Sequence, residues 1–207
     1  MVLCGYLAEG SAAGELRKIG ARDSKLLTDK KRRLLVPKIK KLADDYVLVK
    51  ITAKEIDKLR NASNLNRIEI DRMQHIINLF DPDRVVIDSP EANTKKFAEK
   101  IRQKLRNKSV DIVAENFADK KYPHVSAASI LAKVHRDAEI EKLHKKYGFF
   151  GSGYTSDGRT IAFLKNWIKM NKEFPDFVRK SWATAAVIKE GKEQKNLAGF
   201  IGEENGS

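Results

Sequence analysis

The sequence has 207 residues, of which 42% are hydrophobic and 33% charged, and its 41 Lys and Arg against 28 Asp and Glu give a formal net charge of +13. This length predicts one domain, or a domain with a small appendage, and the composition excludes collagen-like, low-complexity and wholly disordered chains. The excess of cations favours a nucleic-acid partner over a merely charged surface of the thermophile kind, which would not explain the imbalance.

The first half of the chain predicts strands alternating with helices. Apolar β-branched runs predict the strands, and apolar residues at helical spacing predict the helices. The expected elements are a strand at 2–7, a helix at 29–43, a strand at 46–51, a short helix opened by Thr52 with Glu55 in a capping box, a helix at 65–80 and a strand at 84–88. Gly10, Gly14 and Gly20 predict a polar loop after the first strand. Thr28 is the expected N-cap of the following helix, and Pro37 is expected to kink it.

The second half continues the alternation. The expected elements are a helix capped by Thr94 and ending near Leu105, a strand at 109–114, a long helix at 125–147, a glycine-rich loop at 148–158 and helices near 159–171 and 176–190. The polar tail at 191–207 is expected to fray. Short apolar strands between helices predict an α/β fold whose sheet is covered on both faces.

Two aspartates stand at or just beyond the ends of neighbouring predicted strands. Asp88 closes the run Val-Val-Ile-Asp, and Asp119 follows the next strand. Each has an ordinary interpretation, a turn residue for Asp88 and a helix N-terminal acid for Asp119. As a pair, they are the type of oxygen ligand that holds Mg²⁺ or Mn²⁺, and two such ions can clamp a scissile phosphate. In a basic protein this pattern indicates a phosphodiesterase.

Two further segments are candidates for nucleic-acid contacts. Ser126 and Ser129, with Lys133 one turn later, open the long helix with small residues that would suit a phosphate, although tight helix packing is the simpler interpretation. Tyr154, in the glycine-rich loop, could stack on a sugar or base. Cys4 alone excludes an intramolecular disulfide and a cysteine-based zinc site and favours a reducing, cytoplasmic location. No apolar run is long enough for a membrane span, so no membrane contact is expected.

Together these motifs resemble ribonuclease HII in its archaeal form. The most specific stretch is Val-Ser-Ala-Ala-Ser-Ile-Leu-Ala-Lys-Val, and the likeness runs from Met1 to about Glu190. The matching segments are 22–28, 66–69, 86–89, 118–137, 147–157 and 174–182.

The resemblance implies a ribonuclease H-like mixed sheet with a C-terminal helical extension. It implies a catalytic core at 1–147, a substrate-binding region at 148–190 and a flexible tail at 191–207. The implied activity is endonucleolytic cleavage of RNA paired with DNA, including single ribonucleotides in duplex DNA, by two Mn²⁺ or Mg²⁺ ions that leave 3′-hydroxyl and 5′-phosphate ends. We expect a monomer.

The resemblance also assigns roles to individual residues. Asp88 and Asp119 correspond to two of the four metal-binding carboxylates. Tyr154 corresponds to the tyrosine that stacks on the ribose at an RNA–DNA junction. The expected backbone or phosphate contacts are Lys25, Ser126, Ser129 and Lys133.

The sequence departs from the family at its start. The family's opening strand carries Asp-Glu-Ala-Gly-Arg-Gly or a Gly-Lys-Gly variant and supplies the other two carboxylates, whereas residues 1–6 resemble the second strand. Two carboxylates are too few for two ions, and loss of the central strand would leave two sheet edges unpaired. One interpretation is that the natural protein begins upstream of Met1. The alternative is a shortened, inactive homologue that only binds nucleic-acid duplexes. A basic domain that binds acidic proteins has only the charge in its favour.

Overall fold

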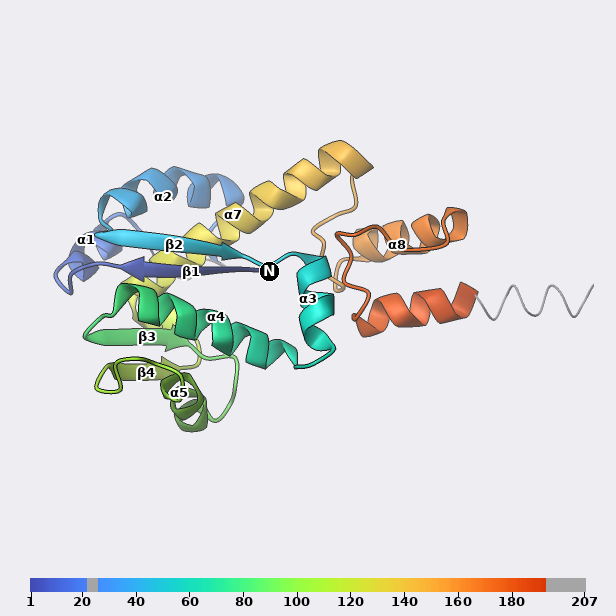
Figure 1. The fold of residues 1–207 in the computed structure, drawn as a ribbon. Helices are drawn as coiled ribbons and strands as arrows, with labels where there is room; N and C mark the ends of the chain where they lie inside the picture. Colours follow the sequence, from blue (N-terminus) through green and yellow to red (C-terminus); the bar gives the residue numbers. More distant parts are fainter. Residues whose placement is uncertain (22–25, 193–207) are drawn as a thin grey trace, which may run out of the picture. The chain divides into compact units, whose positions relative to one another are not determined.

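The structure, a computed structural model, describes residues 1–21 and 26–192. It confirms the α/β class, with strands and helices alternating along the chain (Figure 1). In chain order the elements are β1 (Val2–Leu7), α1 (Ala12–Lys18), α2 (Asp29–Lys41), β2 (Asp45–Lys50), α3 (Ala53–Arg60), α4 (Leu65–Phe80), β3 (Arg84–Asp88), α5 (Thr94–Arg102), β4 (Asp111–Glu115), α6 (Ala118–Lys121), α7 (Pro123–Tyr147) and α8 (Gly158–Met170). Residues 183–192 are also helical.

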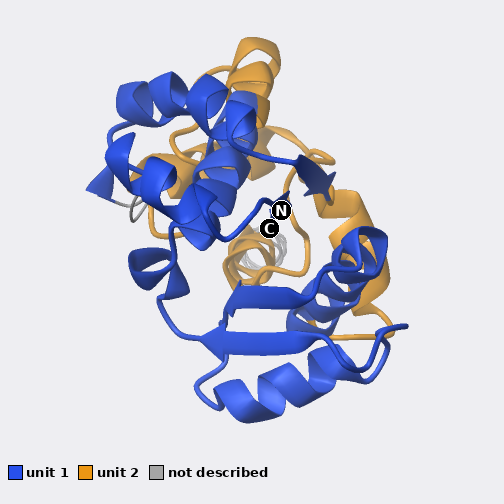
Figure 2. Ribbon diagram, turned by 90° about the vertical axis from the view of Figure 1, so that its left-hand side faces the viewer, with its two compact units in different colours: residues 1–50, 65–138 blue, residues 51–64, 139–207 orange. Residues whose placement is uncertain are grey.

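The chain divides into two compact units, coloured separately in Figure 2. The first contains residues 1–50 and 65–138, and therefore all four strands named above. The second contains residues 51–64 and 139–207. The division falls within α7, and α3 belongs to the second unit although its sequence lies between two segments of the first.

The strands of the first unit form two separate pairs. β1 and β2 are antiparallel, from Val2 opposite Lys50 to Leu7 opposite Asp45. β3 and β4 are parallel, from Arg84 beside Asp111 to Asp88 beside Glu115. Within the described residues β1 is not hydrogen-bonded to β3.

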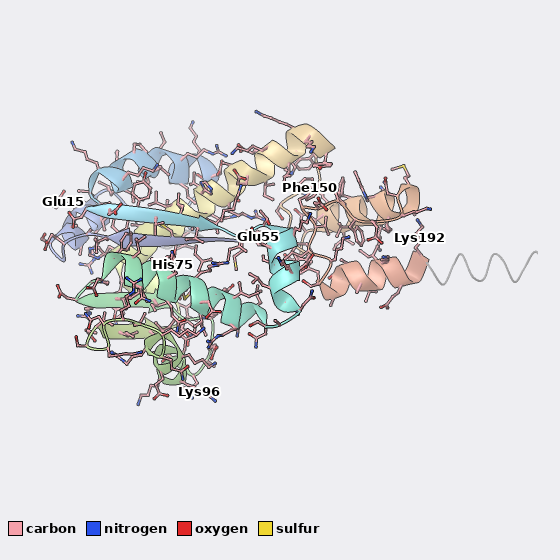
Figure 3. All side chains as sticks on the ribbon, viewed as in Figure 1. Glu15, Glu55, His75, Lys96, Phe150 and Lys192 are labelled. Carbon is pink, nitrogen blue, oxygen red and sulfur yellow. The ribbon has the colours of Figure 1, made fainter. Side chains whose placement is uncertain are left out.

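Each strand pair of the first unit has its own apolar core. Cys4 and Tyr6 of β1 pack against the core formed by the buried residues Leu16, Ala21, Leu27, Ile39, Ala127, Ile130 and Leu131. Val85 of β3 packs against the second core, which contains Ile70, Ile77, Ile87, Phe97, Ile101, Leu105 and Val110. In the second unit, α8 packs through Leu164 and Ile168 on Phe174, Val178 and Ala185. Phe150, which is labelled in Figure 3, lies just after α7. Its ring stacks on that of Phe177 with centroids 5.1 Å apart.

Several local features differ from the sequence predictions. The expected loop after β1 contains the helix α1, which continues through Gly14. Pro37 lies inside α2, as expected from the sequence, and the kink expected there stays a prediction. The N-cap of α5 is Asn93, whose side chain accepts a hydrogen bond from the Lys96 N–H at 2.9 Å, and Thr94 is already helical. The capping box of Thr52 and Glu55 is confirmed. The last helix begins at residue 183, not 176, and residues 193–207 of the predicted tail lie outside the described residues.

Gly5 is required for the close approach of α4 to β1. A Cβ at this position would lie 2.3 Å from Ile76 Cγ2 and 2.9 Å from the Phe80 ring. We expect Gly5→Ala to lower the free energy of unfolding by about 1–3 kcal/mol, because overpacking forces the neighbouring helix to shift. Urea denaturation measures the change. Gly10→Ala is the control, since no atom beyond its chain neighbours lies within 4 Å of its added Cβ. Equal destabilisation of the two variants would contradict this account.

Candidate active site

Asp88 lies at the carboxyl end of β3, where its carboxylate joins β3 to the start of α6. Its Oδ1 accepts a hydrogen bond from the Ala118 N–H at 3.1 Å. Asp88 also lines a cavity of the first unit, which lies between β1 and β3. Asp88 therefore accepts a hydrogen bond within a turn, as its local sequence predicts, and also lines a cavity.

Asp119 is the residue directly after the one that Asp88 contacts. It lies in the first turn of α6 with only 3% of its surface exposed. The turn that precedes it places Phe117 in the left-handed region, with φ of 58°. The structure thus brings Asp88 and Asp119 to the same corner of the first unit, at the carboxyl ends of the parallel strands β3 and β4, where α/β folds place their ligands.

Sequence reasoning missed the residues that hold this corner together. Glu115, beside Asp88 in the register, accepts hydrogen bonds from Lys121 Nζ at 2.9 Å and from the Tyr122 hydroxyl at 2.8 Å. These bonds lower the pKa of the Glu115 carboxyl, Lys121 contributing first and Tyr122 second. The Asn116 amide donates to the Ser89 carbonyl at 2.7 Å and to the Glu91 carbonyl at 3.0 Å. The position of Glu115 at a parallel strand end was the available signal.

The carboxylates of Asp88 and Asp119 suit a hard divalent cation, but they are few ligands. Carboxylate oxygens are the ligands that Mg²⁺ and Mn²⁺ prefer. Across residues 1–21 and 26–192, no group of three or more His, Cys, Asp or Glu side chains is arranged to hold a metal ion. Asp88 and Asp119 together therefore fit part of one coordination shell, and a second ion needs further oxygen ligands.

The start of α7 supports the packing interpretation for one of its two serines. Ser126 has no exposed surface, and its expected contact with a nucleic-acid backbone stays a prediction. Its burial follows from its place beside Ala127, which belongs to the core under β1 and β2. Ser129 is partly exposed and lines the cavity between β1 and β3.

Lys133 belongs to a cluster of cations around one carboxylate. Asp137 Oδ1 lies 2.9 Å from Lys133 Nζ and 3.0 Å from Arg136 Nη1, and its Oδ2 lies 3.6 Å from Arg32 Nη2. Burial raises the pKa of the Asp137 carboxyl, but the hydrogen bonds from Lys133 and Arg136 outweigh it, so the net shift is downward. Asp137 is thus shared by three cations, of which Arg32 also lies 3.8 Å from Asp29 Oδ1.

The lowered pKa of Asp137 predicts a pH-dependent contribution to stability. A carboxyl whose pKa is lower in the folded state stabilises the protein above its unfolded pKa of about 4, and this contribution disappears as pH falls through the folded pKa. We expect Asp137→Asn to cost about 1 kcal/mol at pH 7, allowing for solvent screening, and close to nothing at pH 2. Urea midpoints at the two pH values measure it. Asp111→Asn, which removes an exposed pair with Arg84, is the control; a deficit for Asp137→Asn that persists at pH 2 would contradict the assignment.

Tyr154 lies in the second unit, in a loop fixed by its own hydrogen bonds. Asp157 accepts from the Ser152 N–H at 2.8 Å and from Arg159 Nη2 at 2.9 Å. The Arg159 bonds, with the Ser152 N–H next, lower the pKa of the Asp157 carboxyl strongly. Gly151 has φ of 77°, and a Cβ there would lie 2.7 Å from Asp157 Oδ2. The tyrosine is 48% exposed, so the loop presents an aromatic ring to solvent.

Lys25, the remaining expected phosphate contact, lies outside the described residues.

Within the part of the chain that the structure covers, no helix combines the length and the apolar character needed to cross a membrane.

A family model and the sequences of known proteins match this chain and point to the same family. Residues 1–185 match the family model described as Ribonuclease HII. The ribonuclease HII of Thermococcus onnurineus is 41% identical over 203 residues, covering 96% of this chain and 88% of the relative. That of Methanothermobacter thermautotrophicus is 43% identical over 194 residues and covers 92% of each.

Solved structures agree with the sequence matches. The ribonuclease H2 of Pyrococcus horikoshii superposes with a TM-score of 0.84 at 40% identity, covering 91% of this chain and 89% of the other. The ribonuclease HII of Archaeoglobus fulgidus, solved in a complex with PCNA, gives 0.82 at 35% identity, with coverage of 91% and 88%. A Bst-RNase HIII structure with Mn²⁺ shares the fold, with a TM-score of 0.73 at 15% identity and coverage of 91% and 64%.

Proposed function

The chain belongs to the ribonuclease HII family and is an endonuclease of the ribonuclease H type, and on this premise we propose that it cuts duplex DNA on the 5′ side of an embedded ribonucleotide as well as the RNA strand of longer RNA–DNA hybrids. The products would carry 3′-hydroxyl and 5′-phosphate ends. The observation that carries the proposal is the meeting of Asp88 and Asp119 at one corner of the first unit, through the bond from the Ala118 N–H to Asp88.

The two aspartates are proposed to hold divalent metal, Mn²⁺ or Mg²⁺, beside the scissile phosphate. When bound, such ions activate the attacking water and stabilise the leaving 3′-oxygen. Two ions need more carboxylates than Asp88 and Asp119 supply. The family resemblance assigns the others to a strand ahead of residue 1, so the catalytic proposal includes that strand.

A few further residues are proposed to position the two aspartates and the substrate. Glu115 holds α6, which carries Asp119, through Lys121 and Tyr122. Asn116 ties the same loop to the backbone that follows Asp88. The net charge of +13 attracts the polyanionic duplex. The cations around Asp137, among them Lys133, are proposed to contact its phosphates, and the exposed ring of Tyr154 to stack on the ribose at the junction.

A nicking assay tests the proposal. The substrate is a labelled DNA duplex with one ribonucleotide, beside an all-DNA duplex and a full RNA–DNA hybrid, in Mn²⁺ or Mg²⁺. The protein is used as the chain given and also preceded by the family's Asp-Glu-Ala-Gly-Arg-Gly strand. We expect a single nick 5′ of the ribonucleotide by the extended protein, no cleavage of plain DNA and no cleavage in EDTA.

The assay also separates the proposal from its main alternative. A non-catalytic duplex binder would shift the same substrate in a salt-dependent way and leave it intact in Mn²⁺ with or without the added strand. That outcome would overturn the proposed activity for this chain.

A further inference from the structure

Phe117 has a backbone conformation that its residue type rarely adopts. It directly precedes α6, and its φ of 58° and ψ of 34° lie in the left-handed region. The other non-glycine residue with positive φ in the described part of the chain is Asp81, at 43°, and aspartate enters that region far more readily than a bulky side chain does. A left-handed phenylalanine costs free energy, and a strained residue that persists in a fold points to a function.

The backbone on both sides of Phe117 is held to the segment at the end of β3. The Asn116 amide donates to the Ser89 carbonyl at 2.7 Å, and the Ala118 N–H donates to Asp88 Oδ1 at 3.1 Å. These bonds fix the left-handed turn and account for it. They do not account for the phenylalanine, because glycine or asparagine would adopt the same turn with less strain.

The apolar cores do not account for the phenylalanine either. Phe117 is 60% exposed and belongs to none of the three cores formed by the described residues. Apolar surface left in water is unfavourable, so the residue combines a strained backbone with an exposed ring. Single exposed apolar residues are common, but this one lies where the turn would favour a smaller, polar residue.

The position of Phe117 connects it with the candidate active site. The peptide group that joins it to Ala118 donates its N–H to Asp88, and Asp119 follows in the first turn of α6. A nucleic-acid strand whose scissile phosphate reaches the two aspartates therefore passes close to residue 117. The exposed ring is available to such a strand.

Lys120 adds a cation to the same place. Its Nζ lies 4.9 Å from the centroid of the Phe117 ring, and the side chain is exposed. The neighbouring Lys121 differs, because its Nζ lies 2.9 Å from the Glu115 carboxylate. An ammonium group beside an aromatic face matches the chemistry of a nucleotide, which offers a phosphate to the cation and the face of its sugar to the ring.

We propose that Phe117 and Lys120 are substrate-positioning residues, the ring lying on the sugar of a nucleotide next to the scissile phosphate and the ammonium group contacting a phosphate of the same strand. The inference rests on the proposed function, because it places the substrate strand at Asp88 and Asp119. It explains why the turn carries a strained, exposed phenylalanine where asparagine would be more stable.

Binding and stability should respond in opposite directions to one substitution. Affinity is measured by fluorescence anisotropy in EDTA, with a labelled DNA duplex that contains one ribonucleotide, for the chain given and for the strand-extended protein. We expect Phe117→Asn to bind about tenfold more weakly and to raise Tm by about 2 °C or more, because asparagine enters the left-handed region more readily. Phe117→Tyr should bind like the parent without the gain in Tm. Leu79→Asn, which replaces a 59% exposed leucine of α4, is the control and should bind like the parent.

The salt dependence of binding tests Lys120. Each phosphate contact contributes about one to the slope of log affinity against log salt concentration. We expect Lys120→Gln to lower this slope by about one and to weaken binding about threefold. Lys95→Gln, which replaces an exposed lysine of α5, should keep the parent slope. A parent slope in Lys120→Gln would overturn the phosphate contact.

Isotope-filtered NMR tests the ring contact directly. With ¹³C-phenylalanine protein and unlabelled duplex, we expect NOEs between a phenylalanine ring and sugar protons that disappear in Phe117→Leu. Persistence of those NOEs in Phe117→Leu would overturn the proposal. Parent affinity in Phe117→Asn, or equal weakening by Phe117→Tyr, would do the same. So would weaker binding with a lower Tm in Phe117→Asn, since the ring would then support the fold.

Cleavage by the strand-extended protein is scored separately, so that the two proposals can fail separately. We expect Phe117→Asn to raise KM about tenfold and to change kcat by less than about threefold, because both aspartates remain. Parent kinetics in Phe117→Asn would overturn this inference alone. No cleavage by the strand-extended parent would overturn the proposed activity, while the anisotropy and NOE results would still decide the roles of Phe117 and Lys120 in binding.

Discussion

Replacing Asp88 or Asp119 by asparagine is expected to abolish metal-dependent cleavage of the ribonucleotide-containing duplex by the strand-extended protein. Removing even an outer partner of a metal ligand costs about 10–100-fold, so loss of a ligand itself should exceed about 100-fold. Asparagine is chosen because its carbonyl oxygen can still accept the Ala118 N–H at position 88, and because it keeps the shape of the buried side chain at position 119.

The matched control for both variants is Asp111→Asn. Asp111 opens β4, the strand whose other end is Glu115, and its side chain forms an exposed pair with Arg84. This variant should cleave at the parent rate. If Asp88→Asn or Asp119→Asn, folded by circular dichroism, retains more than a tenth of that rate, the metal assignment is wrong.

Phe97→Ala should produce the largest loss of stability of any single substitution considered for the first unit. Phe97 has no exposed surface and lies in the core that packs α4 and α5 against β3 and β4. Truncating a buried phenylalanine costs about 3–5 kcal/mol, because the transfer free energy is lost and a cavity remains. Because this core supports the strand that carries Asp88, we also expect cleavage to lose heat tolerance.

Urea denaturation of Phe97→Ala gives the free-energy change, and residual activity after heating gives the functional consequence. Met170→Ala is the control, since Met170 is 79% exposed and its truncation should change stability by less than about 0.5 kcal/mol. A Phe97→Ala midpoint within the range of this control would mean that the core can close around the cavity.

Elements with strong apolar patterns could be predicted from the sequence. The spacing of Leu65, Ile68, Ile76 and Ile77 gave the bounds of α4, and the run Val-Val-Ile-Asp gave the end of β3 at Asp88. The motif at residues 125–134 and the aspartates led to the family, which the comparisons confirm. These features are local, and each is supported by several residues at once.

The features that could not be predicted from the sequence depend on tertiary contacts or on unusual backbone geometry. α6 follows Phe117, and a left-handed phenylalanine leaves no sign in the sequence. The burial of Ser126 depends on which side of α7 meets the core. The clamp made by Asn116 joins two loops that are 27 residues apart along the chain. Such contacts become visible only when β3 and β4 are placed side by side.

Paramagnetic broadening by Mn²⁺ tests the central claim most directly, because it reports where the ion sits without requiring activity. In amide NMR spectra of the strand-extended protein, substoichiometric Mn²⁺ should broaden the signals of residues 88–91 and 116–120 first, and Asp88→Asn should abolish the effect. Broadening centred instead on Glu9, Asp44, Asp81 and Asp83, or unchanged in Asp88→Asn, would contradict the assignment of Asp88 and Asp119 as the metal-binding pair.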